Sequence, residues 1–160
     1  DRGTPAAPAL TTEARVVLHA RRRRAALFDD SAGAAVMEVS TLRRDRRVCA
    51  QLEAGGYLRF NDVNLQGIAQ IACEVSAGAG HGGTLEFRAG RPDGPLLGAV
   101  EVPETGRWED WRTVTAAVRD PGGVQDLYVV ARGAPGRAAK RLNLDVLEFV
   151  AAAGQNVSAR

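Results

Sequence analysis

Short stretches in which apolar and polar side chains alternate recur along the chain, whereas helical periodicity is nearly absent. In residues 67–76, Ile71, Cys73 and Val75 would face one side of an extended strand, and Glu74 would face the other. The same alternation is found in Val16–Ala20, Ala35–Val39, Tyr57–Val63, Thr84–Arg88, Leu96–Val102, Trp111–Val118, Asp126–Ala131 and Leu142–Val150. The pattern predicts about nine strands.

Turn-forming residues separate these stretches, as in the RPDGP sequence of residues 91–95 and the DPGG sequence of residues 120–123. So many short strands must bury their apolar faces against a second sheet. We therefore predict an all-β fold, a two-sheet β-sandwich with jelly-roll topology.

The length of 160 residues suits one domain, and 45% hydrophobic and 25% charged residues are typical of globular chains. Residues 1–14 and 151–160 lack apolar periodicity and have the composition of linkers, so we expect the β-sandwich to occupy residues 15–150. No apolar stretch approaches the roughly 20 residues of a membrane-spanning helix, which argues against a membrane partner.

The first residue is Asp, and no signal segment precedes the domain, so we expect a processed or excised piece of a secreted protein. Arginine greatly outnumbers lysine, and Ala, Gly and Val are abundant. This bias suggests a GC-rich bacterial source.

Basic residues are concentrated in one part of the chain. The net charge is only +2, but eight arginines fall between Arg21 and Arg47. Alternate arginines of an extended strand point to opposite sides, and no aromatic stacking platform is interleaved with them. We therefore expect a solvated, salt-paired edge and no nucleic-acid partner.

Motifs of the common enzyme classes are missing. Residues 78–83 contain GxGxxG, but an alternating strand follows instead of a helix, which favours a glycine-rich hairpin turn over a dinucleotide site. The chain has no HExxH, GxSxG or CxxC sequence, and nothing singles out a catalytic pair among its 19 acidic residues. We predict that the domain is not an enzyme.

Two cysteines, Cys49 and Cys73, allow one disulfide but cannot form a structural zinc site alone. Cys73 lies on the apolar side of its predicted strand, where free cysteine is a common small buried residue. Both interpretations stay open at this point.

Aromatic residues are few, at 5% of the chain, and two tryptophans lie close together. Trp111 begins an alternating strand, so we expect it in the core. Trp108 follows Thr105, Gly106 and Arg107 in a loop, where a large ring is less expected without a ligand. Trp108 is therefore the principal functional candidate.

Several segments together resemble family 6 carbohydrate-binding modules. They are GGYLRFNDVNL, GGTLEFRAG with the following RPDGPLLGAVEVPETGRWEDWRTVTAAV, DLYVV and LNLDVLEF. The order of elements is similar from about Val16 to Val150. The resemblance implies a non-catalytic jelly roll that binds glycan chains and keeps an attached enzyme near its substrate.

The resemblance also implies two sugar sites. One lies in loops at the end of the sandwich, where Trp108 and Asn143 match a stacking tryptophan and a hydrogen-bonding asparagine. Gln51 stands where the family has a facing tyrosine, and it could hydrogen-bond a sugar edge instead. The second site lies on the concave sheet face, where Tyr57 matches a ring that stacks on an internal sugar unit.

Many family members hold a structural calcium ion with acidic residues of the first strand and the aspartate of the final NLD sequence. Asp145 matches that aspartate, but His19 and Arg21 stand at the first-strand positions. Calcium prefers oxygen ligands, so we expect nearby arginines to neutralise Asp145 and no cofactor to be bound.

Two functions follow as hypotheses. In the first, the domain binds a polysaccharide or oligosaccharide and targets an attached secreted glycoside hydrolase or sugar dehydrogenase to it. In the second, the β-sandwich has lost sugar binding and serves as a structural or protein-docking domain. An exposed Trp108 ring beside Asn143 would favour the first, and a ring buried under a loop would favour the second.

Overall fold

The computed structural model describes residues 21–40, 45–133 and 140–153, which form strands and one short 3-10 helix. The elements are β1 (Arg22–Arg24), η1 (Ala25–Leu27), β2 (Asp30–Ser40), β3 (Arg46–Asn64), β4 (Ile68–Ser76), β5 (Gly83–Ala89), β6 (Leu96–Val102), β7 (Arg112–Ala117), β8 (Val124–Arg132) and β9 (Arg141–Ala151). The all-β prediction is confirmed. The expected strand Val16–Ala20, linker 1–14 and residues 154–160 of the expected tail lie outside the described residues.

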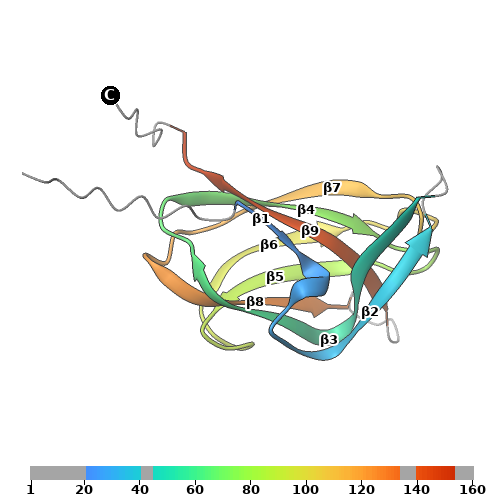
Figure 1. The fold of residues 1–160 in the computed structure, drawn as a ribbon, viewed down its shortest axis with the longest axis horizontal. Helices are drawn as coiled ribbons and strands as arrows, with labels where there is room; N and C mark the ends of the chain where they lie inside the picture. The colour runs from blue at the N-terminus through green and yellow to red at the C-terminus, as the bar shows by residue number, and fades with distance from the viewer. Residues whose placement is uncertain (1–20, 41–44, 134–139, 154–160) are drawn as a thin grey trace, which may run out of the picture.

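The strands form one hydrogen-bonded sheet that folds over into the two layers of a sandwich. β6, β5, β8 and the second half of β3 make one layer, which we call the β8 layer. The first half of β3 makes the other layer with β9, β4 and β7, and we call it the β9 layer. β3 thus passes between the layers, and β2 pairs with both of its halves (Figure 1).

Glycines allow β2 and β3 to bend where they change layer. Gly33 adopts a φ of +59°, a conformation that favours glycine, and the register of β2 breaks between Ala32 and Ala34. A Cβ added to Gly56 would lie 2.5 Å from the carbonyl oxygen of Gly33. The two backbones can therefore approach closely only because both positions lack side chains.

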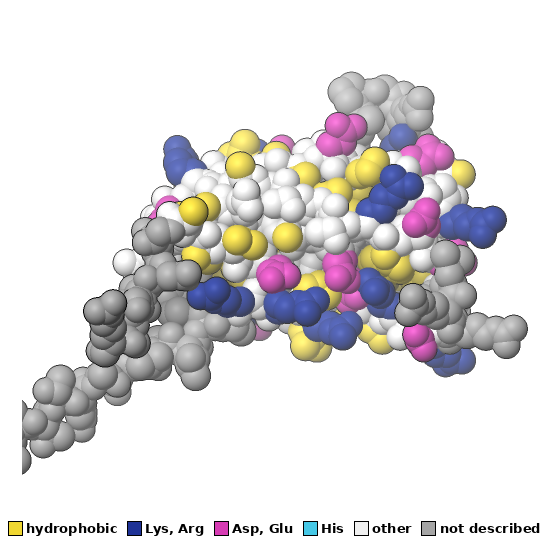
Figure 2. Space-filling view, turned by 90° about the horizontal axis from the view of Figure 1, so that it is seen from above, with side chains coloured by type: hydrophobic (Ala, Val, Ile, Leu, Met, Phe, Trp, Pro, Cys, Tyr) yellow, Lys and Arg dark blue, Asp and Glu magenta, His cyan; other side chains and the backbone are white. Residues whose placement is uncertain are grey.

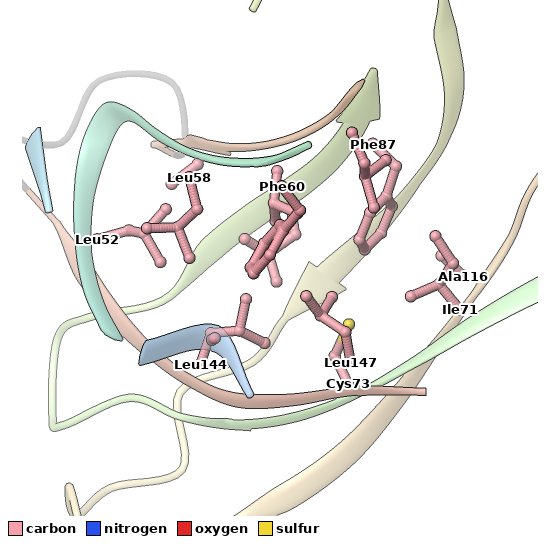
Figure 3. Packing of buried hydrophobic residues seen from close by; sticks show 14 of the residues in the cluster. Leu52, Leu58, Phe60, Ile71, Cys73, Phe87, Ala116, Leu144 and Leu147 are labelled. Atoms are coloured by element: carbon pink, nitrogen blue, oxygen red, sulfur yellow. The ribbon is translucent and has the colours of Figure 1, made fainter. Parts of the chain in front are cut away.

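The hydrophobic core fills the space between the layers (Figure 3). Leu58 and Phe60 of β3 and Phe87 of β5 reach it from the β8 layer, and Ile71 of β4 and Leu147 of β9 reach it from the β9 layer. All five side chains are fully buried. Burial of such rings and branched chains is the main stabilising contribution to a fold of this size.

The two cysteines carry free, buried thiols. Cys49 lies on β3 and Cys73 on β4, and β9 runs between these two strands. Two strand spacings amount to roughly 10 Å, which exceeds the Cα separation that a disulfide spans. The structure therefore resolves the open question in favour of two unbridged cysteines, and Cys73 belongs to the core as its strand pattern predicted.

The arginine-rich edge is salt-paired, as the sequence predicts. Arg22, Arg24, Arg46 and Arg47 each lie within 4 Å of a carboxylate oxygen. On the face shown in Figure 2, basic and acidic side chains are interspersed. Among the described residues, no helix has the length and apolar content needed to cross a membrane.

Candidate functional site

An open hollow of about 500 Å³ lies at one edge of the β9 layer, where β2, β3 and β9 meet the loops before β5 and β7. It brings together three residues predicted from the sequence: Gln51, Trp108 and Asn143. The full lining is Met37, Glu38, Val39, Ser40, Gln51, His81, Trp108, Glu109, Arg141 and Asn143.

A directional series of hydrogen bonds crosses the floor of this hollow. Gln51 Nε2 donates to Asn143 Oδ1 at 3.1 Å, and Asn143 Nδ2 donates to Ser76 Oγ at 3.3 Å. Ser76 Oγ then donates to the backbone carbonyl of Trp108 at 2.8 Å. Strand register produces this series, because Asn143 of β9 pairs with Gln51 of β3 on one side and with Ser76 of β4 on the other.

Burial divides the two amides of the floor into different roles. Asn143 has an exposed fraction of 0%, and its side-chain oxygen and nitrogen both have protein partners. Gln51 is only half-buried, so it presents the accessible amide. In this arrangement, Asn143 positions Gln51 and the Trp108 loop beneath the surface of the hollow.

The ring of Trp108 is half-buried and is held from two directions. A Cβ added to Gly78 would lie 2.6 Å from Cε2 and Nε1 of Trp108, so the indole rests on the Gly78 backbone. The His81 ring lies 5.0 Å from the indole, centroid to centroid, at an interplanar angle of 50°. These contacts fix the plane of the ring while leaving part of it accessible.

Thr105 attaches the Trp108 loop to the end of β4. Its buried hydroxyl oxygen accepts the N–H of Ala77 at 3.0 Å and lies 2.9 Å from the carbonyl oxygens of both Ala77 and Arg107. The N–H of Thr105 also donates to the Ala77 carbonyl at 2.9 Å. The TGxW sequence therefore includes the residue that anchors the loop and the residue that the loop presents.

Sequence reasoning missed the other seven lining residues, among them Met37, His81 and Arg141. His81 lies in the GxGxxG segment, which we expected to be a hairpin turn. The prediction of a hairpin is wrong, because β4 and β5 belong to different layers and do not pair. His81 Nδ1 accepts the backbone N–H of Arg141 at 3.1 Å, so the neutral imidazole carries its proton on Nε2. The glycines of residues 78–83 were the sequence feature that could have pointed to a tight turn at His81.

Tyr57 lies apart from the hollow, on the half of β3 that belongs to the β8 layer. Its ring centroid is 5.3 Å from that of Tyr128, and its hydroxyl lies 3.5 Å from Asp30 Oδ2. The structure thus groups Tyr57 with a second tyrosine and not with Trp108. A platform at Tyr57 stays a prediction.

Asp145 lies in a cluster of ion pairs beside the hollow. The exposed fraction of its side chain is 3%, and its two oxygens lie 3.1 Å from Arg24 Nη1 and 3.2 Å from Arg47 Nη1. Burial raises the pKa of Asp145 above its usual value, and the two guanidinium groups offset only part of this effect. Arg47 also contacts Glu74 at 2.7 Å.

Trp111 completes this cluster, and its expected place in the core is wrong. The Arg47 guanidinium carbon lies 4.7 Å from the centroid of the half-buried Trp111 ring, in a cation–π contact. β7 begins only at the next residue, so Trp111 is not constrained by the alternation of that strand.

A family model described as carbohydrate binding module (family 6) matches residues 24–151. The chain belongs to this family. It is a non-catalytic carbohydrate-binding module, as the resemblance of its motifs implied. A β-1,3-glucan-binding family 6 module from Bacillus halodurans has a TM-score of 0.71 and 29% identity, covering 81% of this chain and 95% of that one.

Two further relatives carry xylose or arabinoxylan in their descriptions. A family 6 module from Clostridium cellulolyticum, solved with xylose, has a TM-score of 0.67 and 25% identity, covering 81% of this chain and 95% of that one. The arabinoxylan arabinofuranohydrolase of Paenibacillus polymyxa is 36% identical over 75 residues, which are 47% of this chain and 12% of the enzyme. The match thus spans about an eighth of that curated relative.

The calcium ion found in many family 6 modules does not fit the residues around Asp145. Both carboxylate oxygens already face guanidinium groups, which would repel a cation. The described residues contain no cluster of three or more His, Cys, Asp or Glu side chains suited to a metal. Arg21 is exposed, and His19 lies outside the described residues. In this module, arginine supplies the positive charge beside Asp145.

Proposed function

We propose that this module binds a β-linked glycan, a xylan or a β-glucan, in the hollow beside Trp108. One observation carries the proposal: a half-exposed indole, fixed by Gly78 and His81, stands beside a polar floor presented by Gln51. An indole face packs against the C–H face of a pyranose, and an amide can both donate to and accept from its hydroxyls.

The choice of glycan class rests on the relatives, one of which binds β-1,3-glucan and one of which was solved with xylose. The parent protein is proposed to be secreted and bacterial, with a catalytic domain attached to this module. Binding would then hold that domain at the polysaccharide and raise its local substrate concentration. Tyr57, which is half-buried and packs against the buried ring of Tyr128, is proposed as a second stacking position on the other layer.

The test is affinity electrophoresis in gels that contain arabinoxylan, mixed-linkage β-glucan or β-1,3-glucan, followed by calorimetry with matching oligosaccharides. We expect retention on at least one glycan, and we expect Trp108→Ala to weaken it at least tenfold. Tyr57→Ala is the comparison variant: a loss confined to it would move the site to the β8 layer.

The proposal would be contradicted if no glycan bound even when its binding sites are present at millimolar concentration. A Kd of that size corresponds to a binding free energy of only about 4 kcal/mol. The fold would then serve as a structural or protein-docking domain.

A further inference from the structure

The wall of the hollow opposite Trp108 contains the only methionine of the chain. Met37 lies on β2 and keeps an exposed fraction of 39%, which is high for a large apolar side chain. It lines the Trp108 hollow and also a neighbouring hollow of about 410 Å³. Met37 therefore stands between two concave surfaces on the same edge of the sheet.

Strand order places Met37 and Trp108 on opposite sides of the polar floor. Across the β9 layer, Ala35 of β2 pairs with Gln51 of β3, and the floor continues through β9 to β4, next to Trp108. The three strand steps amount to roughly 14 Å between backbones. The side chains of Met37 and Trp108 both line the hollow that lies over this floor, and we call the space between them the slot.

Met37 lines the Trp108 hollow, as do Glu38, Val39 and Ser40 after it on the strand, but Val36 before it does not. Alternate residues of a strand share a face, and Ala35 pairs with Gln51, so Met37 lies on the same face of the sheet as Gln51. Val36 is 52% exposed, yet it lines neither hollow. Exposure alone therefore does not account for the position of Met37 in both linings.

We propose that Met37 is the second apolar wall of the sugar clamp, so that a pyranose ring is held between its thioether and the Trp108 indole. This inference rests on the proposed function. Gln51 supplies a polar amide between the walls, and the unbranched, polarisable Met37 side chain can adjust to the ring that it covers. Apolar contact on two faces with polar contact at the edge suits a neutral pyranose of a glycan chain.

The first test compares three variants on the glycan that the native module retains. Met37→Ala should lower the affinity about tenfold, because it removes one wall. Met37→Leu, which keeps an apolar side chain of similar volume, should restore most of the affinity. Val36→Ala is the matched control on the same strand and should leave the affinity within about twofold of the native value.

The second test uses hydrogen peroxide, which transfers one oxygen atom to Met37 Sδ, forming the sulfoxide and water. The polar sulfoxide should weaken binding as much as the alanine substitution does, whereas the Met37→Leu variant should be unaffected by peroxide. Both cysteines are buried, so methionine is the accessible sulfur. Mass spectrometry of the treated protein should show a single added oxygen.

Two results would overturn the role of Met37 while leaving the Trp108 site intact. One is native affinity in Met37→Ala when Trp108→Ala has lost binding. The other is an equal peroxide effect on the native protein and on Met37→Leu. Absence of glycan binding by the native protein would overturn both the clamp and the proposed function.

Discussion

At the scale of single residues, the orientation of the Trp108 ring depends on a missing side chain. Gly78 is not among the glycines with positive φ, so its backbone accepts any residue, but an added Cβ would lie 2.6 Å from the indole. Gly78→Ala should therefore move Trp108 and lower glycan affinity about tenfold, equivalent to about 1.4 kcal/mol. Calorimetry measures this loss.

The control for Gly78→Ala is Ala79→Ser, at an exposed position of the same turn. It should bind as the native module does, and both variants should retain the native circular dichroism spectrum. Unchanged affinity of Gly78→Ala would mean that the plane of the indole does not matter for binding.

Sequence motifs predicted some site residues and not others, for a reason visible in the strand order. Trp108 and Asn143 belong to motifs shared with a family, and Gln51 stands at the position of a family tyrosine, so their grouping could be anticipated. Met37 lies in no such motif. Its place in the hollow follows from the pairing of β2 with the first half of β3, which the sequence pattern did not predict. The burial of Asn143 under Gln51 likewise depends on side-chain packing that spacing does not encode.

At the scale of elements, the sequence pattern located strands well where alternation is strict and poorly where pairing alone holds them. β4 and β5 were predicted closely. The first half of β3 was missed, because Cys49 and Ala50 are both buried in succession and charged residues flank them. The start of β2 was also missed, because Asp, Gly and Ala have low strand propensity and are held there by β3.

Arg47 joins three elements, since it lies on β3 and contacts Glu74 of β4, Asp145 of β9 and the Trp111 ring. Arg47→Ala should destabilise the fold by about 2 kcal/mol, because it leaves the buried Asp145 carboxylate with one guanidinium partner. Arg46→Ala on the same strand is the control. Its side chain is 78% exposed, so it should cost less than about 0.5 kcal/mol in urea unfolding.

Chelation tests the same cluster from another direction. Since arginine supplies the charge beside Asp145, the melting temperature should be unchanged by EDTA and by added calcium. A fall with EDTA that calcium reverses would show that a metal ion contributes to the fold.

At the scale of the whole molecule, the two thiols report on the integrity of the sandwich. Burial raises the pKa of Cys49 to about 11, with a further contribution from Asp145, and it raises the pKa of Cys73 to about 12. Both groups are therefore thiols at neutral pH and are inert while the protein is folded. An Ellman assay should detect no reaction in the native protein and both thiols in denaturant.

Other outcomes of the assay are equally informative. Fewer than two thiols in denaturant would reveal a disulfide, contrary to the separation of β3 and β4 by β9. Rapid reaction of one thiol in the native protein would show that one layer opens locally.

The pairing of β1 with β9 has a mechanical consequence for a tethered protein. The two strands are antiparallel, with Arg22 opposite Glu148 and Arg24 opposite Val146, so the described part of the chain begins and ends at the same end of β9 (Figure 1). Tension applied through both ends of this part of the chain would therefore break the β1–β9 residue pairs one after another, in the unzipping geometry. Asn143 lies toward the other end of β9, so the proposed glycan site would stay intact while the first strand pairs separate.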